Sequence, residues 1–179
     1  MPEKKQVLKI GIVLPQFPSY TETFFINKII GLGERGHSVI VFCASSPSKE
    51  AVESAGLTNY NLKIVALSFR PSALLSPIEF ANCVFIILKS LHTSLSVFKK
   101  RLYNNFCLYV FRKHPCDVYH FGYSAGAINH IPLLHSLPGK TMVSCLGTAE
   151  NVKAVTEEGR RDQLRELFSV ADKILRFNV

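Results

Sequence analysis

The stretch that decides the fold is residues 7–43, which read VLKIGIVLPQFPSYTETFFINKIIGLGERGHSVIVFC. Its first part, residues 7–14, is rich in aliphatic and β-branched residues and stops before Pro15, which is typical of a strand buried in a parallel sheet. Apolar residues then recur at helical spacing over residues 21–33, where glycines can end the helix. Residues 38–43 form a second strand-like run. This order of strand, helix and strand predicts a parallel βαβ unit.

The same alternation continues to the end of the chain. Further strands are expected at 62–67, 117–121, 141–145 and 173–177, and helices at 49–55, 78–113, 124–137 and 160–170. We expect the long 78–113 stretch to contain two helices. The pattern predicts an α/β fold: one Rossmann-like three-layer α/β/α domain over residues 1–179, with a mostly parallel sheet and a helical basic insertion around 78–113. Ligands of such sheets bind at the carboxyl ends of the strands.

Composition limits the classes of partner. The chain has 179 residues, of which 47% are hydrophobic and 19% charged, and this is the profile of a globular domain with a sizeable core. Its net charge is +8, which favours polyanionic partners such as phosphorylated lipids, a membrane surface, nucleotides or nucleic acid. No helix-turn-helix, RRM, KH or zinc-finger pattern is present, so we expect no nucleic-acid partner.

The cysteines and the amino-terminal residues indicate the cellular compartment of the protein. The five cysteines are odd in number, widely spaced and without a CxxC pair, which favours free buried thiols in a reducing cytosol. The first apolar run is short and is interrupted by Lys9, so it is a strand rather than a signal peptide. The histidines have no metal-ligand spacing, and we expect no metal site.

Residues 31–36 read GLGERG and match the GxGxxG pattern of dinucleotide-binding proteins. That pattern must follow a strand and open a helix so that backbone N–H groups reach a pyrophosphate. Here the glycines close a helix and precede a strand. We therefore interpret them as a helix stop and a turn, and we expect no dinucleotide cofactor.

Four segments carry a family resemblance. Residues 14–39 contain FP, a short spacer, TETF, an amphipathic helix, RGH and a strand. Residues 117–122 read DVYHFG, residues 144–152 read SCLGTAENV and residues 171–174 read ADKI. In these segments the chain resembles the amino-terminal, acceptor-binding domain of family 4 (group 1) glycosyltransferases, which have the GT-B fold. The matches cover most of the chain outside roughly residues 45 to 115.

The resemblance implies an activity for the intact enzyme. Such enzymes transfer a sugar from a UDP- or GDP-sugar to a glycan or lipid-linked acceptor with retention of configuration, without a metal, in bacterial exopolysaccharide or lipopolysaccharide synthesis. The family's second domain binds the nucleotide-sugar, and this sequence ends at Val179, where the first domain should close. We therefore expect the donor-binding domain to be absent, the chain alone to be inactive, and no cofactor to be bound here. The alternative is a stand-alone carbohydrate- or lipid-binding module without transferase activity.

The resemblance also implies site residues. His120 matches the histidine that ends the family's central strand and is the candidate catalytic residue; the alternative is a structural histidine with satisfied hydrogen bonds. Thr21 and Glu22 in the first loop, and Gly147 and Thr148 after a later strand, are candidate acceptor-binding residues. Glu22 is equally well interpreted as a first-turn helix residue that favours the helix dipole, and Thr21 as a helix cap.

The chain departs from the family at two of these segments. Leu146 stands where the family usually has histidine or arginine, and Gly122 stands where many members repeat a histidine. Leucine can donate no side-chain hydrogen bond, so backbone N–H groups around Gly147 would have to serve instead.

The stretch 78–113 combines an apolar face with basic residues. Lys89 and His92 interrupt its apolar run, which argues against a transmembrane helix of ~20 apolar residues. It could lie on an anionic bilayer at the cytoplasmic face of the plasma membrane, or it could be a core helix with a solvated basic face. The residues that would face the membrane are Lys99, Lys100 and Arg101.

Overall fold

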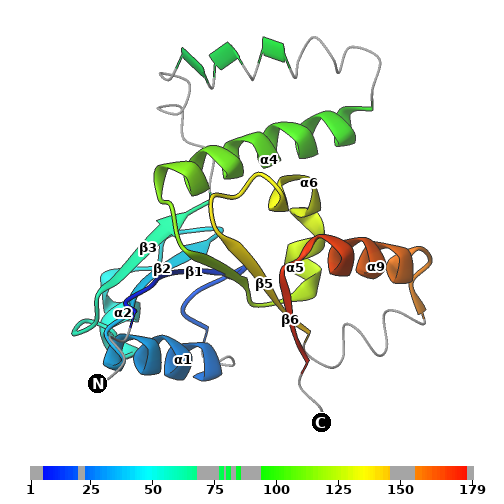
Figure 1. Cartoon of the computed structure of the whole chain (residues 1–179). Helices are drawn as coiled ribbons and strands as arrows, with labels where there is room; N and C mark the ends of the chain where they lie inside the picture. The colour runs from blue at the N-terminus through cyan, green and yellow to red at the C-terminus, as the bar shows by residue number, and fades with distance from the viewer. Residues whose placement is uncertain are drawn as a thin grey trace.

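The structure, a computed structural model, describes residues 6–19, 23–67, 77–78, 80–81, 84–85, 94–145 and 156–176. Its described part is built around one sheet whose strands alternate with helices along the chain (Figure 1). The strands are β1 (Lys9–Val13), β2 (Ser38–Cys43), β3 (Leu62–Ala66), β4 (Val118–Phe121), β5 (Lys140–Cys145) and β6 (Lys173–Arg176). The helices are α1 (Thr23–Glu34), α2 (Lys49–Ser54), α4 (Leu95–Lys113), α5 (Ser124–Asn129), α6 (Ile131–Leu134) and α9 (Arg160–Val170).

The six described strands have the order β3-β2-β1-β4-β5-β6, and every neighbouring pair is parallel. In the centre of the sheet, Ile12 of β1 lies opposite Val41 of β2 on one side and His120 of β4 on the other. The strand order reverses between β1 and β4, which makes this the point where ligands of open α/β sheets bind. The predicted α/β class is confirmed, and the sheet is more regular than the mostly parallel one that the sequence indicated.

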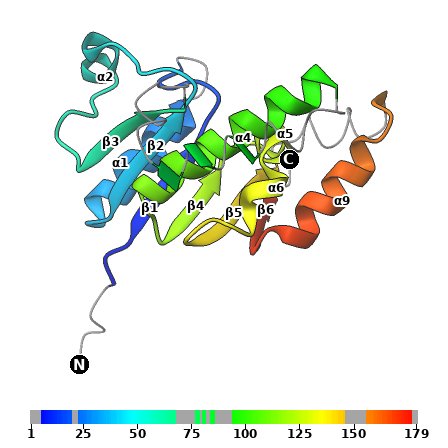
Figure 2. The ribbon, with the colours of Figure 1, turned by 90° about the horizontal axis from the view of Figure 1, so that it is seen from above.

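Helices cover the sheet in two layers (Figures 1 and 2). On one face, Ile10, Ile12 and Leu14 form a core with Phe25 and Ile29 of α1, to which α2 contributes partly buried residues. On the other face a larger core joins the sheet to α4, α5, α6 and α9. Successive strand residues point to opposite faces, so the two cores share each central strand. The domain therefore has the three layers predicted.

The glycines of residues 31–36 end α1 as expected. Gly36 has a φ of 83°, a left-handed conformation that glycine adopts without strain. The backbone N–H of Gly36 donates to Gly33 O at 2.9 Å and that of His37 donates to Leu32 O at 3.1 Å, which is a Schellman helix end. The next residue secures the sheet, because Nδ1 of His37 accepts from the backbone N–H of Leu8 at 3.1 Å. The RGH motif thus ends a helix and anchors its turn at the amino-terminal edge.

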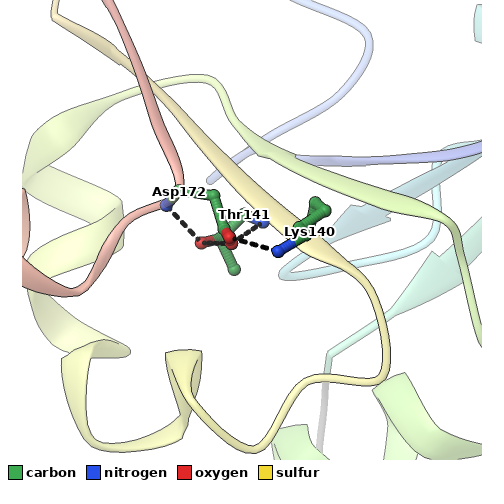
Figure 3. A network of polar contacts seen from close by, with 3 residues as sticks. All are labelled: Lys140, Thr141 and Asp172. Carbon is green, nitrogen blue, oxygen red and sulfur yellow. Dashed lines mark hydrogen bonds and ion pairs between the residues drawn. The ribbon is translucent and has the colours of Figure 1, made fainter.

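Two aspartates at the same edge align neighbouring strands. The carboxylate of Asp172, just before β6, accepts from the backbone N–H (2.8 Å) and the hydroxyl (2.9 Å) of Thr141 and forms an ion pair with Lys140 at 2.9 Å (Figure 3). The hydroxyl of Thr141 in turn accepts from the Asp172 N–H at 3.1 Å. Asp117, just before β4, accepts from the N–H of Lys9 at 2.7 Å. The aspartates of the DVYH and ADKI segments therefore have a structural role in this chain.

The single helix predicted over residues 124–137 was wrong. The structure has two short helices, α5 and α6, that meet at His130. The physical reason is Pro132, which has no N–H to donate to the carbonyl of Ile128 and therefore interrupts the helical hydrogen bonds. The break turns the chain and places His130 between the two helices.

The basic helical stretch is described mainly in its second half, as α4. The predicted division of residues 78–113 into two helices lies largely outside the described residues. Within the described ranges, no helix is long and apolar enough to cross a membrane. Of the predicted thiols, those of Cys43, Cys107, Cys116 and Cys145 are described, and all four are buried and outside any disulfide.

Candidate functional site

A cleft of about 360 Å³ opens at the carboxyl edge of the sheet, where the strand order reverses. One wall consists of the residues that end β1 to β4 or directly follow them, and the other belongs to α4 and α5. The lining residues are Val13, Leu14, Pro15, Ala44, Leu67, Lys100, Tyr103, Asn104, Phe121, Tyr123, Gly126, Asn129 and His130. The cleft occupies the position that the parallel-sheet prediction assigned to a ligand.

Two buried polar side chains in the cleft have unused hydrogen-bonding atoms. Asn104 is 7% exposed and His130 is 6% exposed. Neither Asn104 Oδ1 nor His130 Nδ1 has a hydrogen-bond partner in the part of the chain that the structure describes. Buried polar atoms are almost always paired in native proteins, and leaving one unpaired costs about 1 to 3 kcal/mol. Both atoms are covered by neighbouring atoms, so a ligand in the cleft could pair with them only after a local movement uncovers them.

The side chains of His130 and Tyr103 in the cleft are uncharged at neutral pH. Burial, assisted by the positive charge of Lys100, lowers the pKa of His130 to about 4. Its imidazole therefore has one donor and one acceptor nitrogen. Burial also raises the pKa of Tyr103, so its hydroxyl remains protonated. The Tyr103 ring stacks on His130 with a centroid distance of 5.9 Å and an interplanar angle of 29°. The cleft thus combines neutral hydrogen-bonding groups with a flat aromatic surface.

His120, the predicted catalytic residue, lies on the other face of the sheet. Because side chains alternate along β4, Phe121 lines the cleft while His120 points towards α1, where its ring lies 6.5 Å from that of Phe25. His120 is 2% exposed, and its Nε2 lies 2.7 Å from the hydroxyl of Ser144. Its Nδ1 has no hydrogen-bond partner among the residues described.

The environment of His120 determines what this residue can do. Burial, with a smaller effect from Lys28, lowers the pKa of His120 to about 3, so the ring is neutral at physiological pH. A neutral ring can donate or accept one hydrogen bond through Nδ1, according to its tautomer, while Nε2 is engaged with Ser144. His120 in this state carries no charge that could stabilise a ligand.

The remaining predicted residues divide into two groups. The predicted acceptor-binding residues Thr21, Glu22, Gly147 and Thr148 lie outside the described residues, as does Leu146. Lys99, Lys100 and Arg101 are all exposed on the first half of α4, and of these three only Lys100 lines the cleft.

The departure at Gly122 has a packing cause. A Cβ atom at this position would lie 2.5 Å from Phe25 Cζ and would also overlap Leu14. Because real Cβ atoms essentially never approach other atoms that closely, a histidine at this position would require the side chains of Leu14 and Phe25 to move.

Sequence reasoning missed three polar residues at this edge, namely Asn104, His130 and Ser144. Asn104 had a visible signal, because it shares a helical face with Cys107 and Phe111, at spacings of three and seven, and is a polar residue on that buried stripe. The contacts of His130 and Ser144 join residues far apart in sequence, such as Ser144 with His120, 24 positions earlier. No local pattern reveals such contacts.

A second hollow, of about 530 Å³, lies at the opposite edge of the sheet beside Asp117, Lys140 and Asp172. The carboxylates there already bind the backbone of neighbouring strands. Contacts between neighbouring strands therefore account for the acidic side chains beside this hollow, without a ligand.

Comparison with known proteins identifies no relative: no protein-family model matches the chain, and a search of the curated proteins finds no significant match. Within the described ranges, no group of three or more His, Cys, Asp or Glu side chains could hold a metal ion.

Proposed function

We propose that this chain is the acceptor-binding domain of a retaining GT-B glycosyltransferase. In the intact enzyme a hydroxyl of the acceptor would displace the nucleoside diphosphate of a UDP- or GDP-sugar at its anomeric carbon, as expected from the family resemblance. The observation that carries the proposal is the cleft between the ends of β1 and β4, with its unpaired Asn104 and His130 atoms. An all-parallel sheet with its switch point at this cleft is the framework that the proposal requires.

The chemistry of the cleft suits a sugar. A pyranose has apolar C–H groups on its ring faces and hydroxyl groups around its edge. The exposed part of the Tyr103 ring and the ring of Tyr123 offer apolar surface for such a face. Once a small movement of neighbouring side chains uncovers them, Oδ1 of Asn104 could accept from one hydroxyl, and Nδ1 of His130 could donate to or accept from another. Two buried polar groups that pair with a bound sugar would provide affinity and specificity together.

The role of the domain in transfer would be to position the acceptor. Holding a hydroxyl in place against a bound donor removes much of the entropic cost of bringing two substrates together. On this proposal the contacts to the donor diphosphate come from a second domain, so this domain should bind sugars better than nucleotides. His120 remains the predicted catalytic residue, although it lies on the α1 side of β4 and does not line this cleft.

The test is a titration of the chain with monosaccharides and oligosaccharides, and with UDP, GDP and their sugars, by calorimetry. Asn104→Ala should weaken binding of the sugar about tenfold, because a hydrogen bond that compensates a buried group is worth roughly 1 to 2 kcal/mol. Asn129→Ala is a useful comparison: it changes the same amide to the same methyl group, but at an exposed position on the rim of the cleft. Tight nucleotide binding without sugar binding would refute the assignment to the acceptor half.

The first half of α4 supports a membrane-associated location as part of the same proposal. Leu95 is 65% exposed and Val97 is 42% exposed, and they precede Lys99, Lys100 and Arg101 on the surface. Apolar side chains with basic neighbours are the arrangement by which a helix lies on an anionic bilayer. Flotation with vesicles should show binding to anionic but not to zwitterionic lipid, and Leu95→Ser should reduce it. Equal binding to both lipids would contradict this part of the proposal.

A further inference from the structure

The charges around the cleft are unbalanced. Among the described residues that line it, Lys100 is the one charged side chain, and no aspartate or glutamate is present. No ion pair or hydrogen bond of the Lys100 ammonium group with the described part of the chain is found. Its charge nevertheless acts on the cleft, because it helps to lower the pKa of His130. The lining of the cleft therefore has a positive charge and no acidic side chain to balance it.

Lys100 and Asn104 face the cavity together. They are four residues apart in α4, so they lie on the same side of the helix, separated by about 6 Å along its axis. The flanking residues Lys99 and Arg101 point elsewhere and do not line the cleft. A cationic residue thus lies one helical turn from Asn104, whose amide oxygen is buried and unpaired among the described residues.

We infer that the cleft selects an acidic sugar, whose carboxylate or phosphate pairs with Lys100 while its hydroxyl groups bind Asn104 and His130. The inference rests on the proposed acceptor-binding function and narrows its substrate class. A charge-assisted hydrogen bond to the ammonium is stronger than any bond that a neutral hydroxyl could form there. A nucleoside diphosphate fits less well, because its several negative charges would meet a single cation in this cleft.

The experiment compares matched neutral and acidic ligands on the full chain: glucose with glucuronate and with glucose 6-phosphate, galactose with galacturonate, and inorganic phosphate alone. Each acidic sugar should bind about tenfold more tightly than its neutral counterpart at low salt, and this preference should fall as salt is added. Comparison of the uronates with glucose 6-phosphate determines whether the cleft prefers a carboxylate or a phosphate group.

Lys100→Gln isolates the charge. This exposed substitution should reduce the preference for acidic sugars, measured as the ratio of the affinities for each acidic sugar and its neutral counterpart, to about twofold or less. The matched control is Arg112→Gln, which removes the same charge from an exposed position near the other end of α4 and away from the cleft, and should keep the full preference. Circular dichroism checks that both variants are folded.

Three outcomes would overturn the inference, and they can be told apart. If acidic and neutral sugars bind equally and Lys100→Gln has no effect, the selectivity is refuted while the acceptor-binding function stands. If inorganic phosphate binds as tightly as the sugar phosphate, the cleft is a simple anion site. If no sugar of either kind binds, the proposed function fails together with the inference.

Discussion

Replacement of Asp172 by asparagine tests whether this residue aligns β5 and β6 through its charge. Three hydrogen-bonded contacts to Lys140 and Thr141 lower the pKa of the Asp172 carboxyl group from 3.8 to about 2. Without solvent screening, this lowering would correspond to about 2.5 kcal/mol of folding free energy. The Asp172 side chain is 38% exposed and that of Lys140 is 79% exposed, so we reduce the expected loss in Asp172→Asn to about 1 to 1.5 kcal/mol.

The lowered pKa of Asp172 also predicts how the stability difference changes with pH. A carboxyl group whose pKa is lower in the folded than in the unfolded chain stabilises the fold above the unfolded value and loses that contribution as the pH falls towards the folded value. The difference between wild type and Asp172→Asn should thus be constant above pH 5, fall to roughly half by pH 3, and be largely lost near pH 2.

Urea unfolding from pH 7 to pH 3, followed by circular dichroism, measures this difference. The control is Asp162→Asn, which breaks an ion pair with Arg165 whose side chains are both about 80% exposed; it should cost less than about 0.5 kcal/mol. If Asp172→Asn is no more destabilising than this control, or if its effect does not depend on pH, the carboxylate does not hold the two strands together as argued.

Three further predictions concern the buried residues near the site. The ring resonances of His120 should not titrate by NMR between pH 8 and pH 5, because burial holds its pKa near 3; a midpoint near pH 6.5 would refute the buried placement. Gly122→Ala should lower the free energy of unfolding in urea by about 2 to 3 kcal/mol through overlap with the core, whereas Gly126→Ala, in open space in α5, should be neutral or slightly stabilising. Equal effects at the two glycines would contradict the packing account. Tyr119→Phe should cost about 1 to 2 kcal/mol in the same assay, because the hydroxyl accepts from the Cys116 N–H at 3.1 Å and donates to an α4 carbonyl; an unchanged midpoint would count against it.

The fold could be predicted from the sequence because its signals are local. The central strands are short apolar runs, and the end of α1 is marked by Gly36, whose left-handed conformation favours glycine. The helix boundary at His130 was missed because the apolar period continues across it, although Pro132 was visible. The exact strand order was not predicted, because it depends on which strand β4 pairs with after β3. The hydrophobic pattern of the sequence contains no information about that pairing.

The site could be predicted only in part, because its contacts join distant segments. The sequence placed a ligand at the carboxyl edge and a histidine at the end of β4, but alternation along the strand directs His120 to the α1 face and leaves Phe121 in the cleft. Lys100 was predicted to face a membrane as one of three adjacent basic residues. Its distinct position became clear only from the packing of α4 against α6, which brings it to the same cavity as His130.

The central claim is that the cleft between β1 and β4 binds a sugar, and NMR of the ¹⁵N-labelled chain tests it most directly. Titration with glucuronate, and with glucose for comparison, should shift the side-chain amide signals of Asn104 and the backbone signals of Tyr123 and Gly126 in a saturable way. The signals of Lys140 and Asp172, at the opposite edge, should stay unchanged. Shifts confined to that opposite edge, or no saturable shift with any sugar, would contradict the claim.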